Sequence, residues 1–163
     1  MVRLASQALP DGAQVRPGAI EDLDVDAGSV DLVLSRLALH YVDDVATVFA
    51  RARRWLAPGG RLVVTVVHPV MTSHIARPDR ETPRTSWVVD DYFDPGPRPQ
   101  QWLGSEVTFF HRSVEDYVDA LTGNGFRLTA LRECAPVREA FDDEAEYARR
   151  RRIPRFLLLA AER

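Results

Sequence analysis

The sequence predicts an α/β fold that is built on a doubly wound, mostly parallel sheet with an antiparallel hairpin towards its C-terminus. Residues 30–34 and 61–67 are short runs rich in β-branched residues, which is typical of parallel strands buried on both faces. A segment with helical periodicity lies between these runs. Because neighbouring parallel strands need a crossover connection, usually a helix, this arrangement predicts a strand–helix–strand unit.

The helix of this unit has clear start and stop signals. Asp43 or Asp44 can cap its first turn by accepting hydrogen bonds from free N–H groups. Pro58-Gly59-Gly60 ends it, because glycine adopts the left-handed cap conformation at little steric cost. Apolar residues recur at a spacing of three to four and predict one buried face: Val45, Val48, Phe49, Ala52 and Leu56.

Length and composition indicate one globular domain. A chain of 163 residues is long enough to bury ~70% of the surface that its unfolded form exposes. The formal net charge of −3 gives no general attraction to nucleic acid or to anionic membranes, so we expect neither as a partner. The single cysteine, Cys134, excludes an intramolecular disulfide and fits a reducing compartment, and we expect a cytoplasmic protein.

Further elements are predicted on both sides of the central unit. Residues 1–9 contain good helix formers, residues 14–16 form a weak strand, and residues 18–22 form its turn. Ser113 and Asp116 make a start like a capping box for a helix over residues 113–121. Residues 126–134 and 156–162 then form two strands. The acidic start and basic end of residues 139–152 match a helix macrodipole, which favours a solvated helix over a nucleic-acid site.

Two stretches closely resemble one protein family. The sequences DLVLSRLALHYVDD (residues 31–44) and RWLAPGGRLVVTV (residues 54–66) are similar to strand 4, helix D and strand 5 of class I S-adenosylmethionine-dependent methyltransferases, in their small-molecule branch. The likeness continues through His68-Pro69, residues 91–93 and 111–113, and the last ten residues. It implies a Rossmann-like fold, S-adenosylmethionine as cofactor, and methyl transfer to a small-molecule substrate.

The resemblance also implies that part of the family pattern is missing. Strand 1, the glycine-rich loop and strand 2 of the family have no counterpart, so we expect an N-terminally truncated, incomplete domain over residues 1–163. We expect activity only in a longer parent chain, and the alternative is a non-catalytic remnant that acts as a binding or partner module. The loss would expose the edge of the strand over residues 30–34. Since a free edge is a template for pairing, we expect residues 1–23 or a second chain, in a homodimer, to cover it.

The family's cofactor positions can be carried over onto the residues that match. The turn with Ala19, Ile20 and Glu21 corresponds to the loop that touches the adenine, and its alternative is an ordinary surface turn. Ser35, Arg36 and Leu37 match positions along the methionine part of the cofactor. Tyr41, at the same end of the strand, is a further candidate, because ligands bind at the carboxyl ends of strands in open α/β sheets.

Two histidines and a long irregular segment are the candidates for acceptor binding and catalysis. His40 and His68 each follow a predicted strand, and an imidazole can act as a general base near neutral pH; both also have a structural alternative. Residues 70–110 contain several prolines and aromatic rings, which is typical of a lid or substrate loop, and residues 88–89 and 106–110 can each add a short strand. The expected substrate contacts are Tyr92, Trp102 and His111, and no spaced Cys/His cluster indicates a metal.

Overall fold

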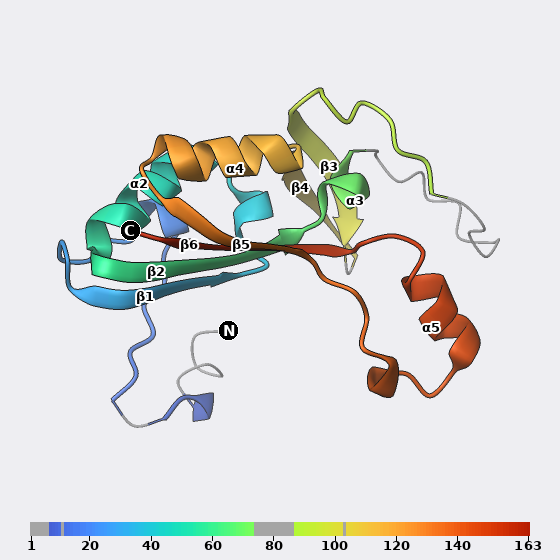
Figure 1. Cartoon of the computed structure of the whole chain (residues 1–163), viewed down its shortest axis with the longest axis horizontal. Helices are drawn as coiled ribbons and strands as arrows, with labels where there is room; N and C mark the ends of the chain where they lie inside the picture. Colours follow the sequence, from blue (N-terminus) through green and yellow to red (C-terminus); the bar gives the residue numbers. More distant parts are fainter. Residues whose placement is uncertain (1–6, 11, 74–86, 103) are drawn as a thin grey trace.

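The computed structural model describes residues 7–10, 12–73, 87–102 and 104–163 (Figure 1). Most of the helix predicted over residues 1–9, and residues 74–86 and 103 of the predicted lid, lie outside the described residues. In the part of the chain that is described, no helix is long and apolar enough to cross a membrane.

A four-stranded sheet forms the centre of the fold, and it confirms the predicted fold class. Its order is β1 (Val30–Arg36), β2 (Leu56–Val67), β6 (Phe156–Glu162) and β5 (Arg127–Glu133). The pair β1–β2 is parallel, whereas β6 is antiparallel to both β2 and β5. Three of these strands therefore run in the same direction, and β5 and β6 make the predicted antiparallel pair at the far edge.

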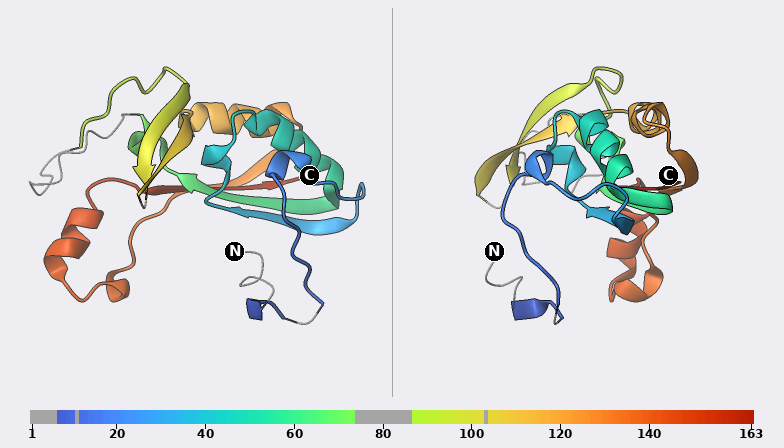
Figure 2. Two further views of the ribbon diagram at one scale, coloured as in Figure 1. Left: turned by 180° about the vertical axis from the view of Figure 1, so that it is seen from behind. Right: turned by 90° about the vertical axis from the view of Figure 1, so that its left-hand side faces the viewer.

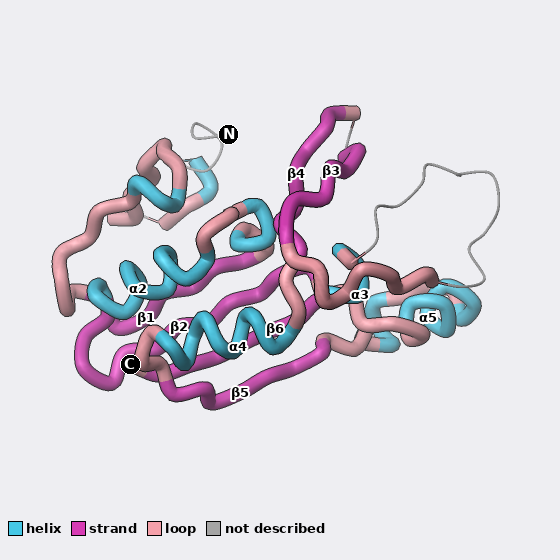
Figure 3. The backbone as a smooth tube through the Cα atoms, turned by 90° about the horizontal axis from the view of Figure 1, so that it is seen from above, coloured by secondary structure: helices cyan, strands magenta, loops and turns pink. Residues whose placement is uncertain are grey.

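Two helices, α2 (Val45–Trp55) and α4 (Val114–Gly123), cover the same face of this sheet (Figures 2 and 3). Both begin where the sequence predicts. The Asp44 carboxylate accepts a hydrogen bond from the Thr47 N–H at 2.9 Å, and Ser113 and Asp116 form a complete capping box. The core between the helices and the sheet is apolar, and its most buried members are Phe49, Leu56, Val64, Leu121 and Leu157.

Shorter elements gather at the end of the sheet where β1 and β2 finish (Figure 1). They are the 3₁₀ turn η2 (Leu39–Tyr41), the short helix α3 (Pro69–Thr72), and a separate hairpin of β3 (Gly96–Trp102) and β4 (Ser105–His111). The connection from β5 to β6 carries η3 (Arg138–Ala140) and α5 (Glu144–Arg150). Near the start of the chain, η1 (Ile20–Asp22) packs against α2.

Three expectations about local structure are wrong. Residues 14–16 form no strand, because no described strand lies beside them to share backbone hydrogen bonds. Residues 88–89 form no strand either, and β4 pairs instead with β3. Pro97 and Pro99 are tolerated in β3 because it has one partner among the described strands. Helix α2 ends at Trp55, earlier than predicted. The Pro-Gly-Gly turn lies within β2 as a register shift, with Gly59 at φ 76°.

The outer edge of β1 is free in the described part of the chain. β1 is the last strand of the sheet, and Leu32 and Leu34 on its face are 56% and 64% exposed. Ile20 and Leu23 pack against the core on the α2 side of this strand. Residues 20–23 therefore cover part of the region beside β1 without pairing with it.

Candidate functional site

A cleft of about 210 Å³ lies between β1, α2 and η1, and it brings together three of the predicted cofactor residues. Ile20 from η1 and Ser35 and Arg36 from β1 all line it. Its remaining walls are almost entirely apolar and include Val33, Leu39, Phe49, Ala52 and Leu62. A cleft of this size can hold a planar ring but is smaller than the roughly 300–1,000 Å³ of pockets that enclose a whole small ligand.

Two buried polar atoms in this cleft have no hydrogen-bond partner among the described residues. They are the Ser35 hydroxyl and the Trp55 indole nitrogen, whose residues are 8% and 3% exposed. An unpaired buried polar group costs roughly 1–3 kcal/mol, so native structures usually satisfy such groups. A bound ligand with hydrogen-bonding atoms would satisfy them here.

Leu37 adopts a strained backbone conformation directly after β1. Its φ of 52° lies in the left-handed region, which branched and bulky residues avoid. The Leu37 N–H donates to the Thr65 carbonyl at 2.8 Å, which anchors this conformation to β2. Strain of this kind is found mostly at functional sites, and this site lies at the carboxyl end of a parallel strand.

The other predicted cofactor residues surround the cleft without lining it. Ala19, the N-cap of η1, and Glu21, within η1, are the exposed sequence neighbours of Ile20. The ring of Tyr41, which is 42% exposed, packs edge-on against the ring of Phe109 and at a tilt against the ring of His40. Tyr41 therefore joins η2 to the β3–β4 hairpin.

His40 is a buried, neutral residue that completes the backbone bonding of β2. It is 2% exposed, and its Nδ1 accepts a hydrogen bond from the Val67 N–H at 3.5 Å, beyond the point where β1 stops pairing. Its ring packs edge-on against Phe109 at 4.8 Å between centroids. Burial lowers the pKa of His40 from 6.5 to about 4. These contacts hold His40 between β2 and the ring of Phe109 on β4.

His68 lies at the end of β2 and is occupied at both ring nitrogens. Its Nδ1 accepts from the Val70 N–H at 3.2 Å as the N-cap of α3, so its Nε2 carries the proton and donates to the Glu133 carboxylate at 3.1 Å. Burial lowers the pKa of His68, and the negative charge of Glu133 partly opposes this effect. Because Glu133 belongs to β5, the His68 ring is directed away from the cleft beside β1.

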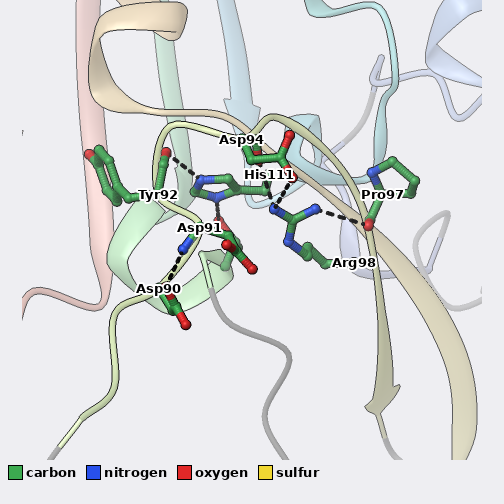
Figure 4. A network of polar contacts seen from close by, with 8 residues as sticks. Asp90, Asp91, Tyr92, Asp94, Pro97, Arg98 and His111 are labelled. Atoms are coloured by element: carbon green, nitrogen blue, oxygen red, sulfur yellow. Dashed lines mark hydrogen bonds and ion pairs between the residues drawn. The ribbon is translucent and has the colours of Figure 1, made fainter.

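His111 and Tyr92 meet in a buried polar network beneath the hairpin (Figure 4). The His111 Nε2 lies 3.0 Å from the Tyr92 carbonyl, and its Nδ1 lies 2.7 Å from the Thr72 hydroxyl. His111 is 1% exposed, and burial lowers its pKa. The network ties α3 to β4, while Trp102 ends β3 opposite Ser105.

Sequence reasoning missed Arg98 and Gln100 on β3. Both side chains are on one face of this strand, and Arg98 is only 9% exposed. The signal was the alternation Arg98-Pro99-Gln100, which places two polar side chains on one face once these residues are assigned to a strand. Because Pro97 and Pro99 flank Arg98, these residues were not expected to form a strand, and the alternation was not recognised.

Comparison with known proteins gives one consistent family. Residues 1–64 match a family model described as a methyltransferase domain. The structure of an S-adenosylmethionine dependent methyltransferase from Mesorhizobium loti is 34% identical, with a TM-score of 0.88, and the match covers 100% of this chain and 76% of that one. A protein from Listeria monocytogenes that is assigned to the same class is 28% identical, with a TM-score of 0.87, and the match covers 100% of this chain and 75% of that one.

The curated relatives match over shorter stretches. The malonyl-[acyl-carrier protein] O-methyltransferase of Hahella chejuensis is 44% identical over 48 residues, which are 29% of this chain and 17% of that protein. The chain spans 42% or less of the length of the curated relatives that it matches.

Proposed function

Because the chain belongs to the S-adenosylmethionine-dependent methyltransferase family, we propose that it serves methyl transfer from S-adenosylmethionine to a small-molecule acceptor. The family and its cofactor are those that the sequence predicted. The observation that carries the proposal is the apolar cleft at the carboxyl end of β1, where the unpaired Ser35 hydroxyl lies two residues before the strained Leu37. Open α/β sheets bind ligands at this end.

The residues of the cleft fit part of this cofactor. Ile20 and the apolar wall of α2 suit an adenine ring, and the Ser35 hydroxyl can hydrogen-bond to a polar atom of the cofactor. When bound, the cofactor supplies an activated methyl group on a sulfonium, so the protein needs no nucleophile of its own. The protein orients the acceptor and excludes water, and the aromatic residues at the base of the hairpin suit that task.

We assign His40 and His68 the role of holding the backbone near the end of β2 in place, and we do not assign them proton transfer. The Nδ1 of each ring already accepts a backbone N–H, and burial lowers the pKa of both, so each is neutral and occupied near pH 7. Residues 70–110 remain our proposal for the substrate loop, and Tyr92, Trp102 and His111 remain our proposal for the substrate contacts. The name of the Hahella relative favours an oxygen atom as the acceptor. No observation favours the alternative of a non-catalytic partner module.

A second copy of the chain is our proposal for the partner along the free edge of β1. Antiparallel pairing of two β1 strands about Val33 would place Leu32 opposite Leu34 of the partner subunit, on the same face. This pairing would cover apolar side chains that are now more than half exposed. Such a dimer would be cytoplasmic, with no nucleic acid or membrane among its partners.

The test is calorimetric titration of the chain with S-adenosylhomocysteine. We expect micromolar binding, and we expect Ser35→Val to weaken it at least tenfold, because valine fills the space of the hydroxyl and cannot hydrogen-bond. Ser105→Val is the matched control, since Ser105 is exposed on β4 and outside the cleft. If protein shown to be folded by circular dichroism does not bind, the proposal is wrong for this chain. Equal binding by both variants would remove Ser35 from the site.

A further inference from the structure

Arg98 is a buried cation that has no hydrogen-bonded counter-ion among the described residues. Its side chain is 11% exposed, and within the described part of the chain its guanidinium donates to two neutral backbone carbonyls, of Asp94 at 2.7 Å and of Pro97 at 3.3 Å (Figure 4). The closest carboxylate oxygen, on the Asp94 side chain, is 4.0 Å away, and that side chain is 77% exposed. Arginine has five N–H donors, so this guanidinium keeps donors for another group. Buried charges are normally paired at hydrogen-bonding distance, whereas the ion pair of Arg98 with Asp94 is long and its partner is exposed.

Gln100 adds a second unsatisfied donor on the same strand. Its Nε2 is buried and has no hydrogen-bond partner among the described residues. Because side chains alternate along a strand, Arg98 and Gln100 project from the same face of β3, with Cα atoms about 7 Å apart. Both side chains are long enough to reach one ligand group between them.

This face of the hairpin is turned towards the site at the end of β1. Across the ladder, Arg98 is opposite Phe109 and Gln100 is opposite Val107, so these four side chains share a face. The Phe109 ring packs edge-on against His40 and Tyr41 of η2, at 4.8 and 5.1 Å between centroids. Since η2 follows β1 by two residues, a group bound by Arg98 would lie near the carboxyl ends of the parallel strands.

We propose that Arg98 and Gln100 bind a carboxylate group of the methyl acceptor, an assignment to the acceptor that rests on the proposed function. A carboxylate supplies the missing negative charge, and its two oxygens match the planar fork of a guanidinium. The Gln100 amide donates to the same group. The acceptor is therefore an anionic molecule, and Arg98 and Gln100 determine that specificity.

The experiment uses malonate as the carboxylate probe and malonamide as its neutral counterpart. Each is titrated into the chain while ¹H–¹⁵N spectra record the side-chain amide of Gln100. We expect malonate to shift this signal in a saturable way and malonamide to leave it unchanged. If malonamide shifts it equally, the site does not recognise charge and the proposal fails. If inorganic phosphate binds in preference to malonate, the assignment to a carboxylate is wrong.

Three variants test the residues by calorimetry with malonate. Arg98→Gln removes the charge, and Gln100→Glu provides an internal carboxylate beside Arg98, so we expect each to weaken binding at least tenfold. Gln100→Glu is nearly isosteric and should keep the thermal midpoint, which shows that it folds. Arg132→Gln is the matched control, because Arg132 also donates to a backbone carbonyl but is exposed on β5. Unchanged malonate binding in both hairpin variants would overturn the proposal.

Titration of the same samples with S-adenosylhomocysteine separates the two proposals. Binding of S-adenosylhomocysteine without binding of malonate refutes the carboxylate site and leaves the proposed function intact. Binding of malonate without S-adenosylhomocysteine shows an anion site but refutes its assignment to a methyl acceptor.

Discussion

The neutral, buried state of His40 predicts how the stability of this fold depends on pH. In the unfolded chain its pKa is the ordinary 6.5, whereas burial lowers it to about 4 in the folded chain. Between these values the unfolded state binds more protons than the folded state. The contribution of His40 is therefore fully present above pH 6.5 and is lost as the pH falls towards 4.

The size of this effect follows from the difference between the two pKa values. One pKa unit corresponds to about 1.4 kcal/mol, so the full shift of His40 changes the free energy of unfolding by about 3 kcal/mol. Lowering the pH from 7 to 5 protonates most of His40 in the unfolded chain but little of it in the folded chain. The free energy of unfolding should therefore fall by about 2 kcal/mol over this step. Burial also lowers the pKa values of His68 and His111, so their contributions have the same sign.

The variant His40→Gln separates His40 from the other histidines. The glutamine side-chain oxygen can still accept the hydrogen bond from the Val67 N–H, but it does not titrate. Loss of the ring contact with Phe109 lowers stability equally at both pH values. Urea unfolding at pH 7 and pH 5 should show that the variant loses about 2 kcal/mol less than the wild type between these values. An equal loss in both proteins would refute the account of His40.

Four further substitutions test the packing and the backbone by thermal and urea unfolding. Phe49→Ala removes a ring that is 0% exposed in the core and should cost about 3–5 kcal/mol; a loss below about 1 kcal/mol would contradict the assigned core. Gly60→Ala would bring a Cβ to 2.8 Å from the Ala57 carbonyl oxygen, so we expect a loss of about 1–3 kcal/mol. The same change at Gly123, where a Cβ meets nothing within 4 Å, should be neutral or stabilise by up to about 1 kcal/mol, and the reverse ranking of the two glycines would contradict the structure. Ser113→Ala breaks the capping box of α4 and should cost about 1 kcal/mol, whereas no change would mean that the cap is replaced by water.

Local chemistry explains which parts of the fold could be predicted from the sequence. The start of α2 at Val45 and of α4 at Val114 follow from caps that a side chain makes within its own turn. The hairpin could not be predicted in the same way. Pro97 and Pro99 are unfavourable in a strand by local rules, and they are tolerated because β3 pairs with a single neighbour among the described strands. That condition is a property of the tertiary structure.

In the candidate site, too, some features follow from the local sequence and others depend on the tertiary structure. Ser35 and Arg36 were expected from the family resemblance and from their position at the carboxyl end of a parallel strand, and both line the cleft. The chemical state of His68 could not be predicted, because it depends on Val70 as donor and on Glu133, a residue 65 positions later. Arg98 was missed for a related reason, since its burial depends on folding of the hairpin against η2.

Successive side chains of β1 point to opposite faces of the sheet, and for this reason the proposed ligand site and the proposed dimer interface lie next to each other. Ser35 is buried in the cleft, while Leu34 is 64% exposed yet also borders the cleft at its open side. A second copy that pairs with β1 would therefore add a wall beside the ligand. If dimerisation changes the affinity for S-adenosylhomocysteine by some factor, the ligand must change the dimerisation constant by the same factor, because coupling between two binding equilibria is reciprocal. The affinity of this cleft therefore depends on the protein concentration. Leu32→Lys opposes pairing, because it places a charge on the apolar face that the partner would cover, and Leu32 does not line the cleft, so this variant isolates the affinity of the monomer.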